Sequence, residues 1–327
     1  MKDRILELLR QESGYLSGQE MSTLLGVSRA AVWKAVEALR KEGYTIDSAP
    51  NRGYHLDAPT GRLSAREIAA RLDGHPWAEL VQVLDSVDST NNLAKTLAAQ
   101  GAPAGTVIVA DSQTGGRGRM GRSFVSPPGV GVYLSVILRP EAPPEELMHL
   151  TCAVAEVLCD GIEVASGLRP GIKWTNDLVS GGRKLCGILT ELSLEAESGH
   201  VQYAVVWAGV NCDQTLSDFP PEIRDMAGSL SMLTGKAVSR NALAAEMIRA
   251  LSRLDGDLVE NRQEWMDRYR RDCVTIGRAV SVSRAGETRW GQAVDVDDRG
   301  ALLVDFGQGP EAVQSGEVSV RGMYGYV

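Results

Sequence analysis

The sequence predicts a multidomain α+β protein with an N-terminal winged helix-turn-helix, a central α/β domain on a mixed or antiparallel sheet, and a small C-terminal SH3-like β-barrel. Three observations support this fold class. The chain has 327 residues, more than one hydrophobic core usually serves. Amphipathic helices fill its start, and strands alternate with helices from Val81 onward. Short strands joined by Gly/Asp turns follow Thr275. The expected domains span 1–62, 63–273 and 274–327.

The composition is that of an ordinary globular protein, with 43% hydrophobic and 23% charged residues. The net charge of −8 argues against a protein that coats polyanions with its whole surface. No apolar run approaches the roughly 18–20 residues that span a bilayer, and the N-terminus lacks a signal-peptide core. The 5 cysteines form no C-x-x-C pair and the 4 histidines show no ligand spacing. We therefore expect neither disulfides nor a zinc site, and a cytoplasmic location.

The N-terminal domain carries three helical patterns. Apolar residues recur at helical spacing over 2–12, a second short helix covers Gln19 to Leu25, and a third runs from Arg29 to Glu42. Ser28 is a suitable N-cap for the third helix. Gly26 lies in the tight turn before it, which is typical of a helix-turn-helix.

A β-hairpin is predicted at Tyr44–Leu56 with its turn at Asn51-Arg52-Gly53, which would make the domain a winged helix. The start of a recognition helix meets base edges and phosphates, and a wing tip reaches a neighbouring phosphate. The predicted DNA contacts are Ser28, Arg29, Ala30, Trp33, Lys34 and Arg52. The alternative is a three-helix bundle used for protein contacts. One such module binds DNA weakly, so a dimer is expected.

After a linker at Pro59-Thr60-Gly61, strands alternate with helices. The predicted central elements are a helix at Ala65–Leu72 capped by Ser64, a strand at Val81–Asp85, a helix capped by Asp88-Ser89-Thr90-Asn91 and ending near Gln100, strands at Thr106–Asp111 and Val130–Leu138, a long helix at Pro144–Glu163, and strands at Ile172–Trp174, Lys184–Glu191 and Val201–Val210. The predicted barrel strands are Thr275–Val282, Thr288–Val296, Ala301–Asp305, Glu311–Gln314 and Val318–Arg321.

The segment from Gly115 to Arg122 reads G-G-R-G-R-M-G-R and places Arg117, Arg119 and Arg122 among four glycines. Glycine lets the backbone bend, and arginine offers a fork of N–H donors that fits phosphate and carboxylate oxygens. The segment therefore predicts a loop that closes over an anion. A solvated basic turn is the alternative for the loop taken alone.

Five motifs occur in order along the central domain: S-T-N at Ser89, Q-x-x-G-R-G-R-x-G-R from Gln113, K-W-x-N-D-L from Lys173, K-x-x-G-I-L-x-E from Lys184, and G-x-N at Gly209. This order resembles biotin protein ligases, and with the winged helix in front it resembles their bifunctional ligase and biotin-operon repressor branch. The resemblance covers nearly the whole chain. Two positions depart from the family pattern: Thr175 stands where proline is usual, and Phe124 where many relatives have tryptophan.

The resemblance implies two reaction steps and a set of partners. Biotin's carboxylate attacks the α-phosphorus of ATP, with Mg²⁺ on the phosphates, to give biotinyl-5′-AMP. A lysine of the biotin carboxyl carrier protein of acetyl-CoA carboxylase then takes the biotin. The adenylate is also the expected corepressor, which promotes a homodimer that binds the biotin operator.

The resemblance also implies residue roles. The catalytic residues would be Lys184, Arg119 and Arg117. The biotin-binding residues would be Ser89, Thr90, Asn91, Gln113, Arg117, Gly118, Arg119, Lys184 and Gly187. The ATP- and adenylate-binding residues would be Arg119, Arg122, Phe124, Lys173, Asn176, Lys184 and Asn211, with Asp177 near the metal.

Several alternatives stay open at this point. Asn176-Asp177 also fits a plain Asx turn, Ser89 also fits a simple helix cap, and Trp174 is expected to lie in the core rather than against a ligand. The barrel is either a part of the ATP and carrier sites or a passive cap. A lipoate-type ligase and a biotin-sensing transcription factor without catalysis are the rival functions.

Overall fold

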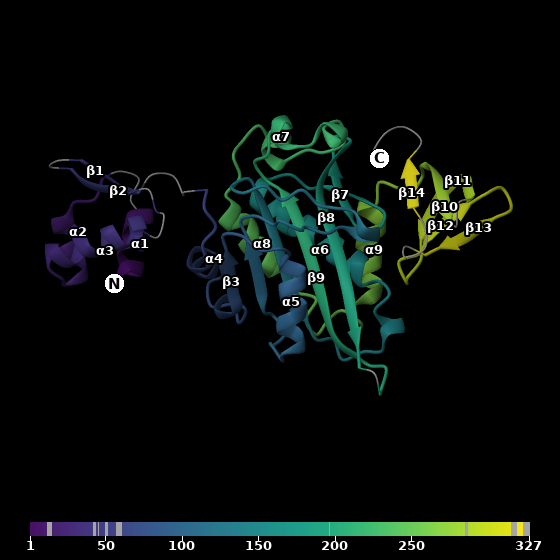
Figure 1. Ribbon diagram of the computed structural model, residues 1–327, viewed down its shortest axis with the longest axis horizontal. Coiled ribbons are helices and arrows are strands. Elements are labelled where there is room, and N and C mark those ends of the chain that lie inside the picture. The colour runs from purple at the N-terminus through teal and green to yellow at the C-terminus, as the bar shows by residue number, and fades with distance from the viewer. Residues whose placement is uncertain are drawn as a thin grey trace. The chain divides into compact units, whose positions relative to one another are not determined.

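The computed structural model describes residues 1–327 except 12–14, 42, 43, 45, 50, 51, 57–60, 196, 285, 286, 315–318 and 323–327 (Figure 1). The chain divides into two compact units, Met1–Arg62 and Leu63–Val327. Each unit contains its own hydrophobic core. The C-terminal strands share the core of the second unit, which begins just before the central domain's first helix.

The first unit has three helices and a hairpin, as predicted. Its elements are α1 (Lys2–Gln11), α2 (Gly18–Leu25), α3 (Arg29–Lys41), β1 (Ile46–Ala49) and β2 (Gly53–Leu56). Helix α2 begins after Ser17, because Ser17 and Glu20 form a reciprocal capping box: the Ser17 Oγ accepts from the Glu20 N–H at 3.1 Å, and the Glu20 carboxylate accepts from the Ser17 N–H at 2.9 Å. The predicted helix end at Glu42 and turn residue Asn51 lie outside the described residues.

The second unit is built on a seven-stranded mixed sheet (Figure 1). Its strands are β3 (Val81–Leu84), β4 (Val107–Ala110), β5 (Gly131–Leu138), β6 (Gly171–Lys173), β7 (Asp177–Ser180), β8 (Arg183–Leu194) and β9 (Val201–Asn211). The strand order is β3-β4-β5-β9-β8-β7-β6, with β3 and β4 parallel and each later pair antiparallel. The predicted mixed sheet is therefore confirmed.

Helices cover both faces of this sheet (Figure 1). They are α4 (Ala65–Leu72), α5 (Thr90–Ala99), α6 (Leu150–Ser166), α7 (Leu230–Thr234), α8 (Arg240–Ser252) and α9 (Arg262–Asp272). Ala94 and Ala98 of α5 pack on Ile108 and Ile137 on one face, whereas α6 and α8 pack on the alternate residues of β4 and β5 on the other. Because side chains alternate along a strand, one sheet serves both layers.

The sequence prediction was wrong at the start of the long apolar helix. Pro144–Glu146 forms a separate 3-10 turn, and α6 begins only at Leu150. Proline at the N-terminus of a helical turn is compatible with that turn, but here two short turns come before the helix: the Leu147 N–H donates to the Pro144 carbonyl at 3.1 Å, and the Leu150 N–H donates to the Leu147 carbonyl at 2.9 Å. Strand β7 and helices α7 to α9 had no counterpart in the prediction.

The C-terminal strands form a five-stranded antiparallel sheet, as expected of a small β-barrel. They are β10 (Ala279–Arg284), β11 (Glu287–Val296), β12 (Leu302–Asp305), β13 (Pro310–Val313) and β14 (Ser319–Gly322), in the order β13-β12-β11-β10-β14. The predicted strand start at Val318 lies outside the described residues. Trp174 is buried, and its Nε1 donates to the Gly300 carbonyl at 3.0 Å. Trp174 therefore belongs to the core that joins the barrel to the central sheet.

All five cysteines are buried and free. Within the part of the chain that the structure describes, no helix is both long enough and apolar enough to cross a membrane.

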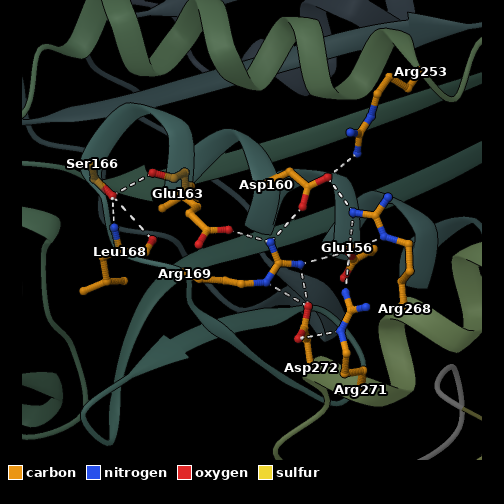
Figure 2. A network of polar contacts seen from close by, with 11 residues as sticks. Glu156, Asp160, Glu163, Ser166, Leu168, Arg169, Arg253, Arg268, Arg271 and Asp272 are labelled. Atoms are coloured by element: carbon orange, nitrogen blue, oxygen red, sulfur yellow. Dashed lines mark hydrogen bonds and ion pairs between the residues drawn. The ribbon is translucent and has the colours of Figure 1, made fainter.

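A partly buried network of charges joins α6 to α8 and α9 (Figure 2). The Asp160 carboxylate accepts from Arg169 at 2.8 Å and from Arg253 and Arg268 at 2.6 Å each. Burial by itself would raise the pKa of Asp160, but the hydrogen bonds from the three arginines outweigh it and lower the pKa from 3.8 to about 2. Asp160 therefore stabilises the fold as an anion.

We expect Asp160→Asn to lower the free energy of unfolding by about 2 kcal/mol at pH 7. The depressed pKa makes this contribution complete above about pH 4 and removes it as the pH falls toward 2, because the native carboxylate then becomes protonated. Denaturant unfolding of both proteins across this range measures the difference. Asp225→Asn, at an exposed carboxylate, is the matched control. A difference that does not shrink between pH 4 and pH 2 would contradict this account.

Candidate active site

Lys184 lies near the start of β8 and forms an ion pair with Asp177 on β7, with Nζ 2.6 Å from Oδ1. The pairing of β7 with β8 shifts by one residue and leaves Leu185 without a partner. Such a bulge reverses the alternation of side chains, so Lys184 and Gly187 come to share a face. A Cβ on Gly187 would lie 3.3 Å from the Lys184 Nζ. The glycine therefore leaves the space that the lysine side chain crosses.

The backbone of Lys184 is held from a second direction. Its N–H donates to the Met226 carbonyl at 2.7 Å, and its carbonyl accepts from the Gly228 N–H at 3.0 Å. The Asn211 Nδ2 donates to the Gly228 carbonyl at 2.9 Å and lies 3.4 Å from the Lys184 carbonyl. Asn211 was predicted as a nucleotide contact. Its side chain is 5% exposed and contacts the backbone of Lys184 and Gly228.

The three arginines of the glycine-rich loop are placed differently. Arg117 and Arg122 are exposed, whereas Arg119 is half-buried and its Nη1 donates to the Asn176 Oδ1 at 2.9 Å. Burial lowers the pKa of Arg119, and the nearby Asp177 carboxylate opposes this shift. Because the ordinary value is 12.5, the guanidinium stays charged at neutral pH.

Asn176 connects this arginine to the sheet. Its Nδ2 donates to the Ile188 carbonyl at 2.7 Å, and its own carbonyl accepts from the Ile188 N–H at 3.0 Å. The side chain therefore bridges the loop and β8, which an isolated Asx turn does not do. Lys173 lies opposite Asp177 in the β6–β7 register. The structure brings together Arg119, Asn176, Asp177, Lys184 and Gly187.

The S-T-N motif lies at the start of α5. Ser89 is the N-cap residue of α5, as the helix-cap interpretation expects, but its side chain makes no capping hydrogen bond. The N–H of Thr90 donates to the Gln113 Oε1 at 3.0 Å and its hydroxyl donates to the same oxygen at 3.1 Å. Asn91 instead donates to the Glu191 carboxylate on β8. The structure thus joins Thr90 to Gln113 and directs Asn91 toward Glu191.

Phe124 lies against β8 and β9. Its ring packs edge-on against Trp207, with 4.9 Å between centroids. A Cβ on Gly187 would lie 3.2 Å from the Phe124 ring, and one on Gly209 would lie 2.8 Å from it. Both strands therefore carry glycine where the Phe124 ring packs against them, and a side chain at either glycine would crowd the ring.

The predicted DNA contacts form an exposed surface of the first unit. Val32, Val36 and Leu39 of α3 are buried. The exposed residues at its N-terminal end are Ser28, Arg29, Ala30, Trp33 and Lys34. On the hairpin, the Arg52 guanidinium lies 4.4 Å from the centroid of the Tyr15 ring.

Sequence reasoning missed several residues that hold the site in place. Met226 and Gly228 act through backbone groups, for which the sequence carries no signal. Arg240 is 3% exposed and its Nη1 donates to Asp111 at 2.6 Å and to the Gly131 carbonyl at 3.0 Å, so it ties together the two ends of the segment that carries the arginine loop.

Three parts of the chain match known family models. Residues 2–55 match an HTH domain, residues 83–211 match the biotin/lipoate A/B protein ligase family, and residues 275–321 match a biotin protein ligase C-terminal domain. The chain is 35% identical over 326 residues to the bifunctional ligase/repressor BirA of Bacillus spizizenii, which covers 98% of both chains. It is 30% identical over 326 residues to BirA of Escherichia coli, covering 98% of this chain and 99% of that one.

Among solved structures, the biotin protein ligase from Aquifex aeolicus in complex with biotin and ATP matches with a TM-score of 0.64 and 28% identity, over 74% of this chain and 98% of that chain. The fold and site thus define a protein of the biotin and lipoate ligase class with a helix-turn-helix domain in front. The chain belongs to the family of bifunctional ligase/repressors within that class.

The base of the arginine loop gives a testable consequence. The Phe124 N–H donates to the Gly116 carbonyl at 2.9 Å, and a Cβ on Gly116 would lie 2.5 Å from the Phe124 carbonyl oxygen. We expect Gly116→Ala to open the loop and to speed tryptic cleavage at its arginines by about tenfold, as followed by mass spectrometry. In Gly118→Ala the nearest atom is 3.6 Å away, so cleavage should keep the wild-type rate. Equal acceleration of cleavage in both variants would contradict the claim that the contact between Gly116 and Phe124 holds the base of the loop closed.

Proposed function

We propose that this chain activates biotin with ATP and transfers it to a lysine of a biotin carboxyl carrier protein, and that its first unit binds operator DNA. The observation that carries the proposal is the cationic cluster of Lys184 and Arg119, ordered by Asp177 and Asn176 at one end of the sheet. Relatives named ligase/repressor, which span the whole chain, support both activities.

The first step joins two anions. The biotin carboxylate attacks the α-phosphorus of Mg-ATP, a C–O–P linkage forms, and the bond to pyrophosphate breaks. The site must therefore neutralise charge and align the reacting groups, with little proton transfer. In this proposal Lys184 donates to the carboxylate and an α-phosphate oxygen, and Arg119 contacts the same reacting group. The exposed Arg117 and Arg122 close over the phosphates.

Mg²⁺ enters this scheme with ATP, as the phosphate complex. Within the described residues, no group of three or more His, Cys, Asp and Glu side chains is arranged to hold a metal ion. Asp177 is paired with Lys184. We therefore assign the metal mainly to phosphate oxygens, with Asp177 as one protein contact and as the group that orients Lys184.

The remaining residues have roles in binding and transfer. Ser89, Thr90 and Gln113 contact the biotin ring, with Gly118 and Gly187 lining the pocket. Phe124 and Lys173 contact the nucleotide, and Asn211 supports this side of the site through its hydrogen bonds to the backbone of Lys184 and Gly228. In the second step the carrier lysine attacks the carbonyl carbon of the adenylate, an amide forms, AMP leaves with the bonding electrons, and the amine releases a proton.

We expect Lys184→Ala to slow formation of biotinyl-5′-AMP by about 10²–10³-fold with the fold intact, because one preorganised cation is lost where charge develops. Pyrophosphate release with biotin and Mg-ATP measures the first step, and the intact mass of a carrier domain measures the second. Lys236→Ala, at an exposed lysine after α7, is the control.

Wild-type rates in Lys184→Ala would remove this lysine from the mechanism. A wild-type chain that adds no mass to the carrier would favour a biotin sensor without catalysis. Mass gain with lipoate but not with biotin would favour the lipoate-type ligase.

The DNA-binding role depends on association. Among the predicted contacts, Arg29, Trp33 and Lys34 are exposed at the start of α3, a position from which a recognition helix reads the major groove. One module contributes few phosphate contacts, so two copies are needed for useful affinity. We propose that the adenylate favours this homodimer, and that the protein works in the cytoplasm, where its free cysteines stay reduced.

Biotin with Mg-ATP should shift the wild-type protein from monomer toward dimer in analytical ultracentrifugation at micromolar concentration. Lys184→Ala under the same conditions should shift much less, because it makes little adenylate. An unchanged wild-type distribution would contradict the link between catalysis and dimerisation.

A further inference from the structure

Ser135 lies in the middle of β5, in the apolar run G-V-Y-L-S-V-I-L, and is 0% exposed. A buried hydroxyl is costly unless it is hydrogen-bonded. Its Oγ lies 2.9 Å from the Thr90 Oγ1. A polar residue at this position therefore has a definite partner, and that partner belongs to the proposed biotin site.

Ser135 starts a chain of hydrogen bonds that runs to the base of the arginine loop. The Thr90 hydroxyl donates to the Gln113 Oε1 at 3.1 Å, the Gln113 Nε2 donates to the Ser126 Oγ at 2.9 Å, and Ser126 donates to the Phe124 carbonyl at 3.2 Å. The four side chains of this chain are all at least nine-tenths buried: Ser135, Thr90, Gln113 and Ser126.

Two backbone groups fix the direction of this chain. The N–H of Thr90 can only donate, and it points at the Gln113 Oε1, so the amide orientation of Gln113 is determined. The Phe124 carbonyl can only accept, so Ser126 must donate to it and must accept from Gln113. Since the Thr90 hydrogen is used on Gln113, Ser135 must be the donor to Thr90.

With the hydrogen bonds in this direction, Thr90 and Gln113 can each form one further hydrogen bond. The Thr90 Oγ1 accepts once and donates once, which leaves one lone pair. The Gln113 Nε2 keeps one hydrogen for which the described residues show no acceptor, whereas its Oε1 already accepts twice. One acceptor beside one donor is complementary to a cyclic urea, which presents an N–H beside a C=O.

We propose that Ser135 is a positioning residue: its hydroxyl holds Thr90 so that the site offers one acceptor and one donor, and thereby selects a cyclic urea over a ring that lacks the carbonyl oxygen. This inference rests on the proposed function, in which Thr90 and Gln113 contact the biotin ring. Removal of the Ser135 hydroxyl frees the Thr90 hydroxyl to change its orientation. It also weakens the hydrogen bonds that follow along the chain, because hydrogen bonds in a chain polarise and strengthen one another.

The test compares the affinities of the full-length protein for biotin and for 2-iminobiotin, whose ring carries C=NH₂⁺ in place of C=O. We expect Ser135→Ala to weaken biotin binding by about tenfold, as for the loss of one buried hydrogen bond, and to narrow the preference for biotin over the imino analogue. Ser135→Thr keeps the hydroxyl and should restore the preference. Ile137→Val, on the same face of β5, is the control for a small change in packing, with thermal unfolding measured alongside.

A double-mutant cycle separates positioning from a structural role. If Ser135 acts through Thr90, Ser135→Ala should have no further effect in a Thr90→Val background. Equal weakening of both ligands by Ser135→Ala, or full additivity with Thr90→Val, would overturn the positioning role while the ligase proposal stands. A wild-type protein that binds no biotin would overturn the proposed function itself.

Discussion

The site depends on holding two cations close together before an anion arrives. Arg119 and Lys184 both lie beside Asp177, and Arg119 is half-buried. Bringing like charges out of water is costly, so each needs a compensating partner. The Asp177 carboxylate compensates Lys184, and the Asn176 amide oxygen accepts from Arg119. Charges that are already oriented stabilise a polyanionic transition state without reorganisation at the moment of reaction.

The sheet supplies the rigidity that this arrangement requires. A regular β8 would direct Lys184 and Gly187 to opposite faces, and the bulge against β7 places them on one face. The backbone at 226–228 then fixes Lys184 from the free side of the strand. Because Gly187 and Gly209 have no side chain, the Phe124 ring packs directly against the backbone of β8 and β9. Irregular features of the sheet thus coincide with the residues to which we assign the chemistry.

The sequence was sufficient for the large features and insufficient for short-range geometry. Helical spacing and the Ser28 cap predicted the winged helix, and ordered motifs predicted the ligase-type site. Strand β7 was missed because only Leu178 and Val179 are apolar in it, and it lies between Asn176-Asp177, which fits an Asx turn, and the turn at Gly181-Gly182. Ser135 and Thr90 lie 45 positions apart, and no local pattern predicts such a pair. The one visible signal was a serine within an otherwise apolar strand, which a single sequence does not distinguish from a tolerated polar residue.

Two polar networks in this chain differ in the hydrogen-bonding capacity that they leave unused. Around Asp160 both carboxylate oxygens accept from arginines, so this carboxylate is satisfied within the protein and serves stability. The chain from Ser135 to Phe124 leaves lone pairs on its hydroxyl groups, and at Thr90 one of these lies beside a Gln113 hydrogen for which the described residues show no acceptor. Unused buried capacity destabilises a fold unless a partner satisfies it. In our proposal the biotin ring satisfies the adjacent acceptor and donor at Thr90 and Gln113.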